Sequence, residues 1–100
     1  MSQQRETVKA RVTAKARVTG RVQGVGFRAW VQREAQSLGL EGWVRNEADG
    51  SVAMLIAGPP ARVSEMLALL WKGPPAASVA GVESEEAAPD GPSNGFQIRR

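Results

Sequence analysis

The sequence of 100 residues contains neither cysteine nor histidine. The lack of cysteine excludes disulfide frameworks, thiolate nucleophiles and cysteine-based zinc sites. The lack of histidine excludes triads with an imidazole base, phosphohistidine intermediates and the most common protein ligand for metals. No apolar run approaches the ~20 residues of a membrane span, and the first residues lack the apolar segment of a signal peptide. We therefore expect a cytoplasmic protein that has no contact with a membrane.

The composition fits one globular domain, with 42% apolar and 23% charged residues. The formal net charge of +3 is unevenly distributed. Residues 1–22 hold six basic residues and one acidic residue, whereas the remainder holds seven basic and nine acidic residues. Such a basic segment can steer anions towards a site. For most of these residues we favour the simpler interpretation, in which charges on an exposed strand prevent aggregation.

Periodicity in the apolar residues predicts the secondary structure. The expected elements are a strand over 14–22, a helix over 27–38, strands over 40–45 and 51–57, a helix between the Gly-Pro-Pro segments at 58–60 and 73–75, a strand over 78–85, a turn-rich loop over 87–94 and a short strand over 96–99. This order predicts an α+β fold, the ferredoxin-like two-layer α/β sandwich: βαββαβ with a short extra C-terminal strand, and an antiparallel sheet with both helices on one face. Trp30 and Trp71 fall on the apolar helix stripes, so we expect them in the core.

The segment 20–28, Gly-Arg-Val-Gln-Gly-Val-Gly-Phe-Arg, lies between the first strand and the first helix. Its glycines can direct backbone N–H groups, a helix N-terminus and a guanidinium towards one small volume that suits a phosphate. It lacks the third glycine of the dinucleotide fingerprint and the Gly-Lys-Ser/Thr ending of a nucleotide-binding P-loop. On these residues alone, a turn without any ligand remains the alternative.

Two separated motifs resemble those of the acylphosphatase family. One is the segment 20–28, and the other is Gly-Trp-Val-Arg-Asn at 42–46 followed by Asp-Gly-Ser-Val at 49–52. The spacing between them and the expected order of elements also match, and the similarity runs from about residue 15 to residue 100. It implies an acylphosphatase-like domain over 14–100, preceded by a basic N-terminal extension over 1–13 that is partly disordered or extends the first strand.

The resemblance implies hydrolysis of the carboxyl-phosphate bond of small acylphosphates, without a metal, another cofactor or a covalent intermediate. Arg28 is then the catalytic residue, whose planar guanidinium binds two oxygens of the phosphoryl group at once. Asn46 is the residue that orients the attacking water, because an amide can accept from water and donate to a phosphoryl oxygen. Phosphate binding falls to Arg28 and to the backbone N–H groups of Gln23, Gly24, Val25, Gly26 and Phe27.

The expected partners are a small acylphosphate substrate and phosphate as product or inhibitor, and we expect a monomer. One alternative is a non-catalytic or partner-dependent acylphosphatase-like domain, and another is an RNA- or anion-binding ferredoxin-like module. An RNA-binding sheet displays aromatic side chains on its central strands. The strands over 14–22 and 78–85, which we expect in the centre, are aliphatic there. Strand alternation turns Trp43 away from Asn46, and Glu47 and Asp49 fit a turn better than a metal site.

Overall fold

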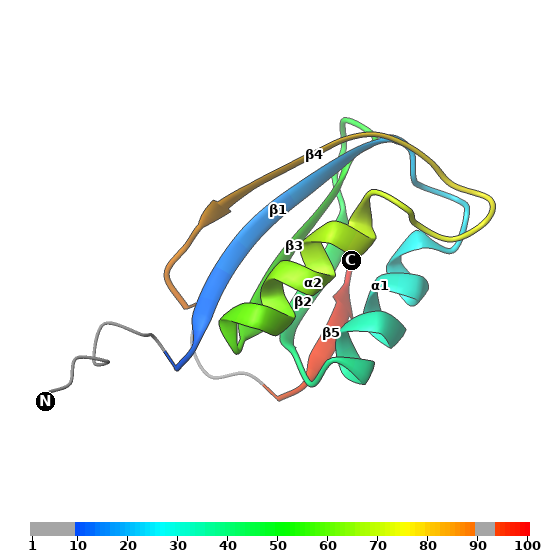
Figure 1. Cartoon of the computed structure of the whole chain (residues 1–100). Coiled ribbons are helices and arrows are strands. Elements are labelled where there is room, and N and C mark those ends of the chain that lie inside the picture. Colours follow the sequence, from blue (N-terminus) through cyan, green and yellow to red (C-terminus); the bar gives the residue numbers. More distant parts are fainter. Residues whose placement is uncertain (1–9, 90–93) are drawn as a thin grey trace, which may run out of the picture.

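The structure, a computed structural model, describes residues 10–89 and 94–100 (Figure 1). Its elements in chain order are β1 (Val12–Arg21), α1 (Phe27–Ser37), β2 (Glu41–Asn46), β3 (Val52–Gly58), α2 (Pro60–Leu70), β4 (Ser78–Glu86) and β5 (Phe96–Arg99). This order confirms the predicted ferredoxin-like fold with an added C-terminal strand. Most of the predicted N-terminal extension, residues 1–9, and part of the predicted loop, residues 90–93, lie outside the described residues.

The sheet has the strand order β4-β1-β3-β2-β5. β1 is antiparallel to β3 and β4, and β2 is antiparallel to β3, but β5 is parallel to β2. The sheet is therefore mixed, and the prediction of a wholly antiparallel sheet is wrong at its last strand. The reason lies in the path of the chain. β4 is antiparallel to β1 and β2 runs in the same direction as β1, so β4 ends at the end of the sheet where β2 begins. A strand that starts from that end and pairs with β2 must run in the direction of β2.

The prediction that the strand over 78–85 is central is also wrong. β4 is an edge strand, and β3 occupies the middle of the sheet. The crossover through α2 carries the chain from one side of β1 to the other, which adds β4 outside β1 (Figure 1). The central strands that determine the character of the open face are therefore β1, β3 and β2.

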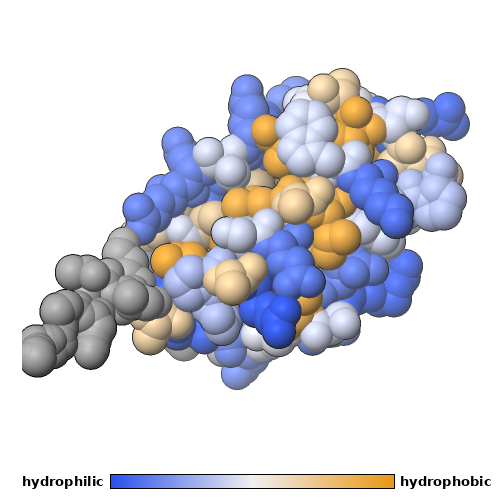
Figure 2. Space-filling model, in the orientation of Figure 1, coloured by the Kyte–Doolittle hydropathy of each residue, from blue (hydrophilic) through white to orange (hydrophobic). Residues whose placement is uncertain are grey.

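Both helices cover the same face of the sheet (Figure 1). Along β1, Ala14, Ala16 and Val18 are buried beneath the helices, whereas Lys15 and Arg17 point to the opposite face and are exposed. Full burial of one large apolar side chain contributes about 1.5–3 kcal/mol. Several large side chains in this layer are fully buried, namely Phe27, Met54, Ile56, Met66 and Leu70. The outer surface on the helix side shows apolar patches interrupted by hydrophilic side chains (Figure 2).

The two tryptophans that were predicted to lie in the core differ in their exposure. Trp30 is half-buried against the core, broadly as predicted. Trp71 is 56% exposed, so its prediction as a core residue is wrong. It follows Leu70, the last residue of α2, which is fully buried. Because successive helical residues point about 100° apart, Trp71 turns away from the sheet.

Candidate active site

The loop between β1 and α1 exposes its backbone. Gly24 and Gly26 have φ values of 76° and 78°, in the left-handed region that glycine adopts without strain. Gly26 is the N-cap of α1 and supplies no side-chain hydrogen bond to the helix N-terminus. In the described part of the chain, the N–H groups of residues 23–27 donate no loop or turn hydrogen bond to the backbone. These donors, next to the positive end of the helix dipole, form a cradle for an anion.

A pocket of about 210 Å³ opens between this loop, the start of α1 and the ends of β2 and β5. It is smaller than the 300–1,000 Å³ typical of sites for drug-sized ligands, so it suits a small anion. The lining residues are Val22, Gly24, Gly26, Phe27, Arg28, Ala29, Asn46 and Ile98. The predicted residues Arg28 and Asn46 thus meet in one pocket, although they lie on different elements.

Two of the residues predicted to bind phosphate do not line this pocket. The side chain of Val25 packs partly buried against the core, and that of Gln23 turns to the hairpin between β2 and β3. The prediction concerned only the backbone N–H groups of these two residues.

Arg28 is the second residue of α1, and its side chain is held at the pocket by β5. Its Nη1 donates a hydrogen bond of 3.3 Å to the backbone oxygen of Arg99. None of the ion pairs among the described residues includes Arg28. A cation at a helix N-terminus is disfavoured by about 0.3–1 kcal/mol. An anion bound between the guanidinium and the helix would offset this cost.

Asn46 ends β2, and its side chain lies on the helix side of the sheet. It points away from Trp43 and Arg45, which meet on the open face, as strand alternation predicts. Among the described residues, the side chain of Asn46 has a buried oxygen, Oδ1, with no hydrogen-bond partner. A buried acceptor left unpaired costs about 1–3 kcal/mol. A 180° rotation of the side-chain amide would exchange this oxygen with the amide nitrogen and give the oxygen access to a donor in the pocket.

Gln23 ties the loop to the hairpin that follows Asn46. Its Nε2 donates hydrogen bonds of 2.8 Å to the backbone oxygens of Glu47 and Ser51. The same hairpin is closed by a 2.9 Å bond from the N–H of Glu47 to the oxygen of Ser51. Sequence reasoning missed this role of the Gln23 side chain. The only signal was an amide placed among glycines, which does not reveal the distant carbonyl groups that it binds.

A polar cluster stabilises the tip of the same hairpin. Asp49 Oδ1 accepts bonds from the Ser51 N–H at 2.9 Å and from the Ser51 hydroxyl at 2.6 Å. Arg17 Nη1 donates to Asp49 Oδ2 at 2.7 Å and to Ser51 Oγ at 3.1 Å. The hydrogen bonds from Ser51, followed by the charge and hydrogen bond of Arg17, lower the pKa of Asp49 below its ordinary 3.8. Asp49 is therefore a turn residue, as its position in the sequence predicts.

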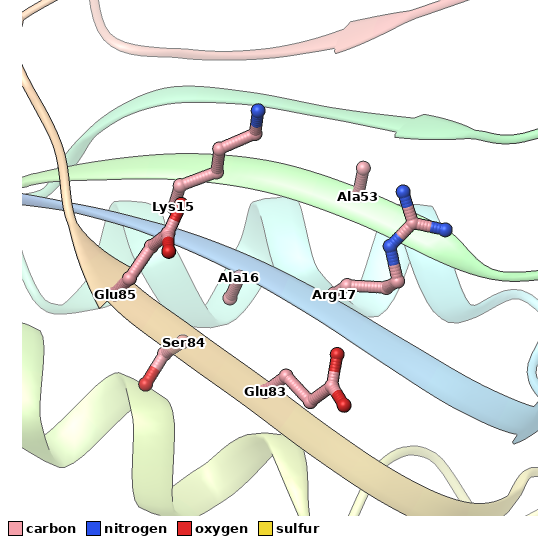
Figure 3. A pocket seen from close by; sticks show the side chains of 7 residues that line it. All are labelled: Lys15, Ala16, Arg17, Ala53, Glu83, Ser84 and Glu85. Atoms are coloured by element: carbon pink, nitrogen blue, oxygen red, sulfur yellow. The ribbon is translucent and has the colours of Figure 1, made fainter.

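The open face of the sheet carries charges of both signs. A second pocket of about 240 Å³ lies there (Figure 3), where Lys15 and Arg17 of β1 stand opposite Glu85 and Glu83 of β4. This mixture gives no continuous basic surface for a nucleic-acid backbone.

Trp43 is the large aromatic side chain on this open face. It is only 8% exposed, since the guanidinium carbons of Arg45 and Arg99 lie 4.8 Å and 4.9 Å from its ring centre. A shielded ring offers no stacking platform for bases. The open face thus does not favour the RNA-binding alternative.

Two further findings concern residues 10–89 and 94–100, the described part of the chain. No group of three or more acidic side chains in these ranges is arranged to hold a metal ion. No helix in these ranges is long and apolar enough to cross a membrane.

The fold and the pocket define a small ferredoxin-like protein with a candidate anion site at the junction of β1 and α1. The sequence profile of the Acylphosphatase family matches residues 14–98, and the chain belongs to this family. An acylphosphatase of Rhizobium meliloti (strain 1021) is 61% identical over 100 residues, which cover 100% of this chain and 99% of the relative. The relationship shows an enzyme, a hydrolase with acylphosphatase activity.

Solved structures agree with this assignment. An acylphosphatase from Coxiella burnetii superposes with a TM-score of 0.85 at 34% identity, over 90% of this chain and 94% of that chain. The acylphosphatase from Bacillus subtilis gives a TM-score of 0.84 at 35% identity, over 89% of this chain and 99% of that chain. The same fold also forms 12% of the much longer T. kodakarensis HypF chain, with a TM-score of 0.78 at 31% identity over 87% of this chain.

Proposed function

We propose that the pocket between the β1–α1 loop, β2 and β5 hydrolyses the carboxyl-phosphate bond of small acylphosphates by direct attack of water. The oxygen of water forms a bond to phosphorus while the bond from phosphorus to the acyl oxygen breaks. The electron pair of that bond leaves with the carboxylate, and both protons of water end on the phosphate. A carboxylate is a stable leaving group that requires no general acid, which fits a chain without histidine.

Positioning and charge stabilisation account for most of the catalysis of phosphoryl transfer, because the transition state is loose. In our proposal the guanidinium of Arg28 binds two phosphoryl oxygens, and the N–H groups of residues 23–27 bind the remaining charge. The bond from Arg28 to the Arg99 oxygen limits the rotation of the guanidinium before substrate arrives. Such preorganised donors act in the transition state without a cost of reorganisation.

The observation that carries the proposal is that Arg28 and Asn46, which lie on different elements, line one pocket beside the loop N–H groups. Once the side-chain amide of Asn46 turns its oxygen towards the pocket, a water that donates to this oxygen would present its lone pair to a phosphorus held by the loop. The amide nitrogen of Asn46 remains available to a phosphoryl oxygen. The hydrogen bonds from Gln23 to the hairpin would hold Asn46 at a fixed distance from the loop, and so would fix the position of the water relative to the phosphate.

The test is phosphate release from benzoyl phosphate in the presence of EDTA. Arg28→Ala and Asn46→Ala should each lower kcat by about 10²–10³-fold, or about 2.7–4 kcal/mol, as expected for loss of one preorganised donor. Arg33→Ala, an exposed arginine of the same helix, is the matched control and should retain wild-type kcat. Full activity of both active-site variants would refute the assigned roles, and loss of wild-type turnover in EDTA would refute a metal-independent reaction.

A further inference from the structure

Ile98 is a large hydrophobic residue with an unexpected exposure. It is 40% exposed. Of the large hydrophobic residues in the described part of the chain, only Trp71 is also exposed. Trp71 lies beyond the end of α2 and does not line the pocket, whereas Ile98 does. Phe96, two residues earlier on β5, is 3% exposed in the core. The exposed apolar surface of Ile98 thus lies at the boundary between the hydrophobic core and the pocket.

The pocket has a polar part and an apolar part. The polar part consists of the glycine N–H groups, Arg28 and Asn46, and Ile98 with the neighbouring Ala29 contributes apolar surface. A phosphate ion alone would use only the polar part. A ligand that also covered the apolar part would have to carry more than a phosphate group.

The strand register sets the distance between the two parts. Ile98 pairs with Val44, two residues before Asn46 on the adjacent parallel strand. With a rise of ~3.3 Å per residue and a strand spacing of ~4.8 Å, the Cα atoms of Ile98 and Asn46 lie about 8 Å apart. Both residues line the pocket, so a phosphoryl group attacked by a water at Asn46 can have its departing oxygen on the side of Ile98. A water on Asn46 then leaves the acyl group at the Ile98 end.

We propose that Ile98 binds the acyl group and makes the enzyme selective for acylphosphates with an apolar acyl group, such as an aromatic one. This inference rests on the proposed function, because it assumes that the phosphoryl group binds between the loop and Arg28. The acyl group covers the exposed part of Ile98 and removes its apolar surface from water. Binding energy gained there favours a benzoyl over an acetyl group, which is too small to cover the side chain.

The experiment compares kcat/KM for benzoyl phosphate and acetyl phosphate in the wild type, Ile98→Thr and Trp71→Thr. Threonine keeps the β-branched shape that suits a strand but removes apolar carbon atoms. Wild type should prefer benzoyl phosphate, and Ile98→Thr should lower the ratio of the two kcat/KM values about fivefold. Trp71→Thr removes the other exposed apolar side chain and should leave the ratio unchanged.

A second variant and a second ligand separate this inference from a structural effect. Ile98→Val removes one carbon, keeps the strand intact and should lower the ratio about twofold. The inhibition constant of inorganic phosphate, which has no acyl group, should stay within twofold of the wild-type value in both variants. An unchanged ratio, or an equal fall for both substrates, would overturn the inference while leaving the proposed function intact. Absence of wild-type turnover of either substrate would instead refute the proposed function.

Discussion

Replacing Gln23 with alanine tests whether the loop and the Asn46 hairpin act as one unit. The change removes two hydrogen bonds of 2.8 Å from the side-chain amide to the carbonyl groups of Glu47 and Ser51. A typical intramolecular hydrogen bond contributes about 0.5–1.5 kcal/mol, so the free energy of unfolding should fall by about 1–3 kcal/mol. For a domain of this size, each kcal/mol lowers Tm by about 4–8 °C.

The substitution should also lower kcat, and it should do so with little change in KM. Without Gln23 the hairpin can shift relative to the loop, and a misplacement of ~1 Å can lower a rate by about 10²-fold. We expect kcat for benzoyl phosphate to fall about 10–100-fold. KM should change little, because the loop N–H groups and Arg28 would still bind the phosphoryl group. The assay is steady-state phosphate release at a temperature well below the Tm of the variant, which circular dichroism measures.

Gln32→Ala is the matched control for this prediction. Its Nε2 also donates to a backbone oxygen, that of Phe96 at 2.9 Å, but it does not contact the hairpin. The control should lose about half as much stability as Gln23→Ala and keep kcat near the wild-type value. If Gln23→Ala lost stability but retained kcat, Gln23 would be a purely structural residue. A raised KM with unchanged kcat would instead assign it to substrate binding.

Three other changes test the hairpin and its strands. Gly42→Ala should destabilise the fold by more than about 4 kcal/mol, because a Cβ there, at a φ of 143°, would overlap the backbone oxygen of Leu55. Gly50→Ala, at a φ of 93° with open space around the site, should cost only about 1–2 kcal/mol in the same thermal unfolding assay. The hydrogen bonds from Ser51 keep the folded pKa of Asp49 below 3.8, so its stabilisation is complete above that pH and is lost as pH falls through the folded value. Between pH 4 and pH 2, Tm should therefore fall more steeply in the wild type than in Asp49→Asn, and equal slopes would contradict this.

Periodicity was sufficient to predict the order of the helices and strands. The strand boundaries agree within about two residues, as with β1, which begins at Val12 rather than residue 14. Alternation also placed Trp43 and Asn46 on opposite faces, because successive side chains of a strand point in opposite directions. The errors concern neighbours in space: the edge position of β4, the parallel pairing of β5 and the exposure of Trp71. Local patterns do not determine which strand pairs with which.

The candidate site shows the same division. Arg28 and Asn46 were predicted from motifs, and the pairing of strands brings them to one pocket. The side-chain role of Gln23 depends on carbonyl groups of a hairpin far along the chain. That of Ile98 depends on the register between β5 and β2. Neither dependence is visible in the residues around these positions.

The sequence by itself determined the chemistry that is available. The absence of histidine and cysteine removed imidazole and thiolate catalysis, and the glycines of the loop permitted the positive φ values that expose backbone N–H groups. Both properties depend on single residues or on their immediate neighbours. The tertiary structure alone decided the shape of the pocket and its apolar end, because these arise from long-range strand pairing. Only when β5 pairs with β2 do Ile98 and the Arg99 oxygen reach the pocket that Arg28 lines at the start of α1.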